Sequence, residues 1–238
     1  EEKDKEPIGY LPEERGLYKK TKVNDMLMYL GELKGGERLR LQEQIDYWLE
    51  HFDLMHWKDK PISELSKGMS QKVQFTAAVA HEPDILFFDE PFAGLDPVSS
   101  DLLRDSITEL SRSGKTVLFS THIMEQAERL CNRIFLINRG DQVVYGSLEE
   151  IKEAHGSNSV VVEFDGDGSF IRDLPGVASA TSYQRYVEVE LSEGCDPDDL
   201  LSQLVGKISI MRFEVVSPSL HNIFISMVGA DNAEEKGE

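Results

Sequence analysis

ILFFDE, at residues 85–90, is the stretch of this sequence that decides its fold class. Four consecutive apolar residues lead directly into two carboxylates, Asp89 and Glu90. An apolar run of this kind is typical of a strand buried on both faces of a parallel sheet. A helical pattern follows at residues 99–112 and a second apolar strand at residues 116–119. This alternation continues to Val144 and predicts an α/β sheet.

The chain before this stretch is mostly helical in pattern. Residues 8–11 indicate a short strand, which Pro12 ends. Apolar residues then recur at helical spacing over residues 23–33 and again over residues 41–52. Residues 69–80 form a third predicted helix, which leads into the strand at residue 85.

The pattern changes near residues 155–158. Beyond them the sequence predicts a small α+β domain with helices at residues 197–205 and 220–228. Its predicted strands are residues 160–164, 177–181, 187–191 and 208–215. We therefore expect an α/β domain over residues 1–154, a small α+β domain over residues 155–230 and an acidic tail over residues 231–238.

Composition restricts the function classes. The formal net charge of -19 makes nucleic acid and anionic lipid unfavourable direct partners, because both are polyanions. The same charge also suits plain solubility. No apolar run approaches the ~18 residues that cross a bilayer. We expect no nucleic-acid partner, and any membrane association should run through a protein. Cys131 and Cys195 lie far apart, in no metal-ligand spacing, and we expect both to be reduced.

Two groups of polar residues stand out around the acidic strand end. Asp89 could hold Mg²⁺ and Glu90 could polarise an attacking water, although apolar strands ending in acids are common without function. About twenty residues earlier, Ser66-Lys67-Gly68 opens the helix that follows. Free N–H groups at such a helix start, with a Ser hydroxyl, suit an anion, and Ser66 equally suits a plain N-cap.

Two further groups follow the acids. Gly94-Leu95-Asp96 reads as a turn with an N-cap for the next helix. Ser120-Thr121-His122 ends the next strand, where a lone His is usually structural. At the carboxyl edge of a parallel sheet, beside the carboxylate strand, His122 could instead contact a γ-phosphate.

The order of these groups is more specific than any one of them. The succession LSKGMSQK, ILFFDEP, GLD and STH resembles the ABC ATPase family over about residues 8–150. The resemblance implies a P-loop NTPase fold of the ABC-ATPase type, with ATP and Mg²⁺ as cofactors. It also implies two ATPase subunits, as a homodimer or heterodimer, and separate transmembrane permease subunits. The chain would then be cytoplasmic, on the inner face of the cell membrane.

The same resemblance implies roles for individual residues. Ser66, Lys67 and Gly68 correspond to the signature sequence, which touches the γ-phosphate of an ATP held by the opposite subunit. Asp89 corresponds to the Mg²⁺-associated acid and Glu90 to the catalytic base. Asp96 corresponds to the D-loop acid, and His122 corresponds to the switch histidine. Lys67 and Met69 stand where Gly and Gln are commoner.

Two segments extend the resemblance. Residues 8–18, IGYLPEERGLY, are similar to the family's Q-loop region, with Glu13 at the usual Gln position. Glu13 can still ligate Mg²⁺, but it adds negative charge beside the phosphates. Residues 218–224, PSLHNIF, are similar to the end of the small domain in two-subunit exporters of sodium and drugs, and equally suit a Ser-capped amphipathic helix. The implied function is ATP-driven transport, in the export direction.

The phosphate-binding pattern G-x-x-x-x-G-K-[S/T] does not occur in the 238 residues. Gly114-Lys115 and Gly206-Lys207 are the two Gly-Lys pairs, and neither has a Gly five residues before its own Gly. Thr116 completes a GKT, but it opens a strand where the loop requires a helix. We therefore expect a fragment of a longer product, with an incomplete ABC-ATPase fold and almost no hydrolysis alone. A non-transport ABC ATPase and a non-catalytic regulatory module remain as alternatives.

Overall fold

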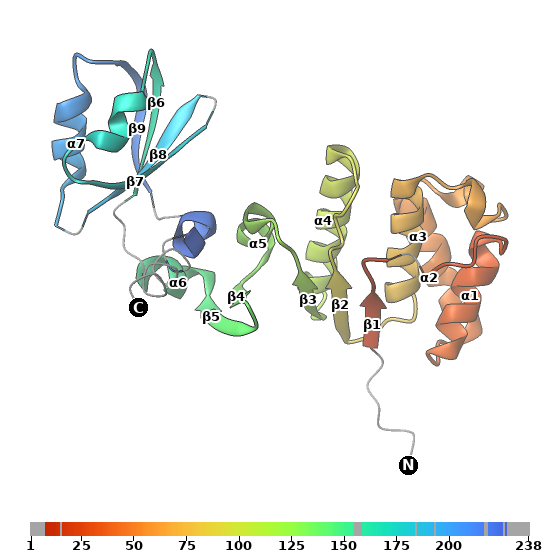
Figure 1. The fold of residues 1–238 in the computed structure, drawn as a ribbon. Coiled ribbons are helices and arrows are strands. Elements are labelled where there is room, and N and C mark those ends of the chain that lie inside the picture. Colours follow the sequence, from red (N-terminus) through yellow and green to blue (C-terminus); the bar gives the residue numbers. More distant parts are fainter. Residues whose placement is uncertain are drawn as a thin grey trace. The chain divides into compact units, whose positions relative to one another are not determined.

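The computed structural model describes residues 8–14, 16–154, 159–183, 185–192, 194–216, 219–225 and 227. The chain divides into two compact units, Glu1–Ile123 and Met124–Glu238, which are described separately below (Figure 1). Within the described residues, no helix is both long and apolar enough to cross a membrane. The acidic tail predicted at residues 231–238 lies outside the described residues.

The first unit contains a three-stranded parallel sheet in the order β1-β2-β3. Its strands are β1 (Ile8–Leu11), β2 (Ile85–Asp89) and β3 (Thr116–Ser120). A parallel pair needs a long crossover, and α4 (Pro97–Arg112) supplies the one between β2 and β3. The α/β prediction is confirmed, and all three strands end at the same edge of the sheet (Figure 1).

Three helices connect β1 to β2. They are α1 (Val23–Leu33), α2 (Arg38–His51) and α3 (Lys67–Val79), with short 3₁₀ turns at Met55–Trp57 and Ile62–Glu64. Aromatic rings join α2 and α3 to the sheet, because Phe75 of α3 lies 5.4 Å from Trp48 and 5.2 Å from Phe88 of β2 between ring centroids. The helical patterns in the sequence therefore predicted this part of the fold.

One prediction about the sheet is wrong in the described part of the chain. The apolar runs of β2 and β3 indicated strands buried on both faces. Leu86 and Phe88 are buried, but Phe87 is 39% exposed and Leu118 is 47% exposed. The alternation arises because the buried side chains pack toward helices such as α3, whereas Phe87 and Leu118 point to the other face of the sheet.

The second unit begins with a helix and a hairpin. α5 (Met124–Leu130) precedes the antiparallel strands β4 (Arg133–Asn138) and β5 (Asp141–Ser147), and α6 (Leu148–Ala154) follows. Residues 220–225 are helical, and Leu220 and Ile223 join the same apolar cluster as Ile134 and Val144. The motif at residues 218–224 thus forms an amphipathic helix where it is described.

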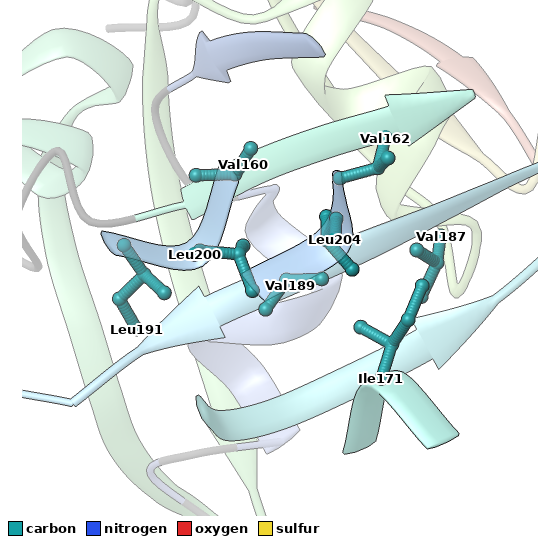
Figure 2. Packing of buried hydrophobic residues seen from close by; sticks show 8 residues of the cluster. All are labelled: Val160, Val162, Ile171, Val187, Val189, Leu191, Leu200 and Leu204. Carbon is teal, nitrogen blue, oxygen red and sulfur yellow. The ribbon is translucent and has the colours of Figure 1, made fainter. Parts of the chain in front are cut away.

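The rest of this unit is a four-stranded antiparallel sheet in the order β7-β8-β6-β9. The strands are β6 (Ser159–Asp165), β7 (Val177–Ser182), β8 (Tyr186–Leu191) and β9 (Ser209–Val216). Figure 2 shows its core, where Val160 and Val189 pack with Leu200 and Leu204 of α7 (Pro197–Leu204) and with Ile171 of the 3₁₀ turn Ser169–Asp173. The small α+β domain is thus present, and its boundary at residue 155 stays a prediction.

His81, just after α3, makes the stability of the first unit sensitive to acid. Its Nε2 lies 3.3 Å from the carbonyl oxygen of Ile8, to which Lys34 Nζ also donates at 3.3 Å. Burial, and then the charge of Lys34, lowers the pKa of His81 from 6.5 to about 4. The unfolded chain therefore binds this proton more tightly, so stability present above pH 6.5 is lost as the pH falls toward 4.

We expect His81→Gln to lose less stability than the wild type as the pH falls from 7 to 4. The reason is that Gln keeps an N–H donor for the Ile8 carbonyl and does not titrate. The free energy of unfolding from urea titrations at several pH values between 7 and 4 measures the effect. His56→Gln, at an exposed position, is the control. Parallel pH profiles for the wild type and His81→Gln would contradict this account.

Candidate active site

The carboxyl edge of the parallel sheet brings Glu90 and His122 into direct contact. Nδ1 of His122 lies 2.7 Å from Oε1 of Glu90, and the backbone N–H of His122 donates to the same oxygen at 2.9 Å. The Glu90 side chain is only 17% exposed, whereas that of His122 is 79% exposed. A carboxylate held by an imidazole at a sheet edge is an arrangement that suits proton transfer from a bound water.

The backbone at Glu90 adopts a conformation that is unusual for this residue type. Its φ is +45°, in the left-handed region that side chains other than Gly avoid. Such a conformation costs on the order of 1–3 kcal/mol and persists only where neighbouring contacts hold it. The turn allows the carboxylate to reach the end of β3, where His122 lies.

Ser120 connects the two acids and was missed as a site residue by sequence reasoning. It is the register partner of Asp89 in the β2–β3 pair. Its Oγ accepts a hydrogen bond from the Glu90 backbone N–H at 3.2 Å and donates to Oδ1 of Asp89. The available signal was a hydroxyl at the last position of the strand that precedes His122.

Ser66 acts as the N-cap of α3. Its Oγ accepts a hydrogen bond from the Met69 N–H at 3.2 Å, so the plain-cap interpretation is observed. Accepting that bond uses a lone pair of the hydroxyl and does not use its proton. Ser66 and Lys67 are both exposed. The start of α3 can therefore cap its own helix and still donate to an external anion.

The start of α3 packs against the segment that follows Glu90. The Lys67 side chain lies directly across Gly94, where a Cβ would collide with its end, and Gly94 has a φ of +71°. Leu95 approaches the position where a Cβ of Gly68 would lie, at 3.6 Å. Gln71 of α3 also donates to the carbonyl of Pro91 at 3.1 Å. The structure thus brings the start of α3 and the Gly94–Asp96 turn together.

Asp96 is the N-cap of α4. Its carboxylate accepts hydrogen bonds from the Ser99 amide at 3.0 Å and the Ser99 hydroxyl at 2.8 Å. These two bonds lower the pKa of Asp96 below its ordinary value. Asp96 therefore caps α4, as the sequence predicted.

We expect Asp96→Ala to lower the Tm by about 2–4 °C, because the first turn of α4 loses its cap. Asp96→Asn, whose side-chain oxygen can still accept from Ser99, should lower the Tm by less. Thermal unfolding followed by circular dichroism measures both. An Asp96→Ala variant with the wild-type Tm would show that this cap contributes nothing.

Glu13 lies beyond the end of β1, at the carboxyl edge where Asp89 also lies. Its side chain is exposed. Gln74 of α3 donates to the carbonyls of Pro12 at 3.4 Å and Glu14 at 3.1 Å, so the backbone on both sides of Glu13 is held against the helix.

The donor set at this edge suits Mg²⁺. Asp89 and Glu13 offer carboxylate oxygens, which Mg²⁺ prefers. Among the described residues no group of three or more His, Cys, Asp or Glu side chains could hold a metal. Nucleotide-bound Mg²⁺ needs no such cage, because it takes one or two protein carboxylates together with phosphate oxygens and water.

Comparison with known proteins identifies the family of this chain. The ABC transporter family matches residues 1–93, and the C-terminal domain of DrrA1-3-like ATP-binding proteins matches residues 146–228. The ABC transporter ATP-binding protein YhaQ of Bacillus subtilis is 43% identical over 223 residues, which cover 94% of this chain and 75% of YhaQ.

Two other similar proteins agree. The Nod factor export ATP-binding protein I of Rhizobium sp. is 30% identical over 228 residues, covering 94% of this chain and 73% of that protein. A solved ATP-binding subunit of an ABC transporter superposes with a TM-score of 0.59 at 30% identity, over 63% of this chain and 62% of that one. The chain therefore belongs to the ATP-hydrolysing, ATP-binding proteins of ABC transporters, and it carries a DrrA1-3-like C-terminal domain.

Proposed function

We propose that Glu90 is the general base of ATP hydrolysis in this chain and that His122 orients it. The observation that carries the proposal is the double contact of the Glu90 carboxylate with the ring and the backbone of His122. A water beside the second Glu90 oxygen loses its proton as it attacks the γ-phosphate. His122, which is largely exposed, senses that phosphate.

Asp89 and Glu13 are the residues that would hold Mg²⁺ at the carboxyl edge of the sheet. Bound Mg²⁺ neutralises charge on the β- and γ-phosphate oxygens. Asp89 is fixed by the Ser120 hydroxyl, and Glu13 by the anchored backbone around it. Glu13, at the position where the family usually has Gln, adds negative charge beside the phosphates. We therefore expect ATP hydrolysis to depend more strongly on Mg²⁺ here than in relatives that have Gln.

Two subunits share each ATP, head to tail. Ser66 and Gly68 at the start of α3 donate to the γ-phosphate of a nucleotide held by the other subunit. The exposure of Ser66 and Lys67 supports this, because a group that contacts a second chain must be accessible in the single one. Asp96 lies on the neighbouring turn and carries the signal between the two sites.

The chain powers export through separate membrane permeases and lies on the inner face of the membrane through them. Members of this family pair with such permeases, and the match to a DrrA-like domain and to a Nod factor export protein supports the direction. The loop after β1, from Glu13 to Lys22, contacts the permease. The substrate is chosen by the membrane subunits.

Hydrolysis can be measured in a loop-bearing chimaera, in which this chain replaces the aligned segment of an ABC relative that has G-x-x-x-x-G-K-[S/T] upstream. We expect Mg²⁺-dependent phosphate release from the chimaera and almost none from the 238-residue chain. A folded chimaera that binds ATP and releases no phosphate would overturn the proposed function in favour of a non-catalytic module.

A further inference from the structure

We propose that Ser120 is a positioning residue for hydrolysis, which holds Glu90 in the conformation that reaches His122. The inference rests on the proposed function of Glu90. The proposed function depends on the contact between the Glu90 carboxylate and His122. This inference depends instead on the contacts of the Ser120 hydroxyl with the Glu90 amide and the Asp89 carboxylate.

One hydroxyl satisfies both contacts without conflict. Ser120 donates its single proton to Oδ1 of Asp89 and accepts the Glu90 N–H with a lone pair. The parallel register places Ser120 directly beside Asp89, so the side chain needs no rearrangement to reach the first residue beyond β2. Ala at this position would remove both contacts and leave the strand pairing intact.

The Glu90 backbone is the place where such a bond matters most. At a φ of +45° the residue needs neighbouring contacts to persist. The Ser120 bond holds the amide on the N-terminal side of the turn, and the carbonyl of Glu90 accepts from Ala93 at 3.0 Å on the other side. Loss of the first bond frees the peptide to rotate, which moves the Glu90 carboxylate away from His122.

A polar residue that merely ends a strand would behave differently. Its removal would lower overall stability and would change every amide of the sheet alike. Removal of a positioning residue instead changes the Glu90 and His122 amides selectively, because the His122 N–H depends on the Glu90 carboxylate.

Amide hydrogen exchange on the 238-residue chain, resolved by residue with NMR, distinguishes these two cases. We expect Ser120→Ala to speed exchange at Glu90 and His122 about fivefold or more relative to the amides of α4, and Ser120→Thr to restore the wild-type rates. Ser113→Ala is the matched control, since its hydroxyl bonds the Leu110 carbonyl at the far end of α4. Unchanged Glu90 and His122 exchange in Ser120→Ala, or no recovery with Thr, would overturn the proposal.

The catalytic consequence is measured in the loop-bearing chimaera. We expect Ser120→Ala to lower kcat about 10- to 100-fold and Ser120→Thr to recover it, because a misplacement of about 1 Å is enough for such a loss. A wild-type kcat in Ser120→Ala would overturn the positioning role while leaving the proposed function standing. A wild-type chimaera without hydrolysis would overturn the proposed function, and the exchange result would still decide whether Ser120 holds Glu90.

Discussion

Replacing Phe75 by Ala is expected to lower the free energy of unfolding of the first unit by about 3–5 kcal/mol. Phe75 is fully buried, and its ring lies against Trp48 and Phe52 of the α2 segment and Phe88 of β2. It therefore joins the helices to the strand that carries the acids. Ala would leave a cavity that three rigid rings cannot fill by small shifts.

Urea unfolding followed by tryptophan fluorescence measures this loss, because both tryptophans, Trp48 and Trp57, lie in the first unit. Phe87→Ala is the matched control. It also removes a Phe side chain, from the position of β2 next to Phe88, where the ring is 39% exposed. This substitution should lower the free energy of unfolding clearly less than Phe75→Ala. Equal losses for the two variants would contradict the assignment of the core to the Phe75 side of the sheet.

Replacing Glu90 by Gln is expected to lower the hydrolysis rate of the loop-bearing chimaera about 10²- to 10⁴-fold. Gln occupies the same volume and can still contact His122, but it cannot take a proton from water. ATP affinity should change little, since the substitution removes no proposed phosphate contact.

Phosphate release at saturating MgATP measures the rate. Glu82→Gln is the control, because Glu82 is also a glutamate with a positive φ, and its carboxylate pairs with Arg40, away from the proposed site. A Glu90→Gln chimaera that kept about a tenth or more of the wild-type rate would exclude Glu90 as the base.

The sequence predicted helices well where burial of one face sets the spacing of the apolar residues. The helices over residues 23–33 and 41–52 followed from apolar residues at helical spacing, since their inner faces pack together. The meeting of Glu90 and His122 followed from the rule that parallel strands end at one edge. The contact of Lys67 with Gly94 could not be predicted, because it depends on how α3 sits against a turn far along the chain.

Local pattern could not predict which faces of the sheet are covered. The apolar run at residues 85–88 is the same whether one face or both are packed, so Phe87 was wrongly expected to be buried. The φ of Glu90 was equally hidden, because a strained residue is held by tertiary bonds such as that from Ser120, not by its own propensity. Ser66 illustrates the same limit of local pattern. A Ser at the start of a helix suits both an N-cap and an anion site, so the sequence alone does not distinguish the two roles.

The most direct test of the central claim, that Glu90 of one subunit and Ser66 of the other act on the same ATP, mixes two inactive chimaeras. One carries Glu90→Gln and the other Ser66→Arg. Each mixed dimer would contain one site with both substitutions and one site with neither. We expect hydrolysis to return to about a quarter of the wild-type rate, because half of the randomly mixed dimers each hold one intact site of two. No recovery from dimers shown to have mixed would contradict the claim.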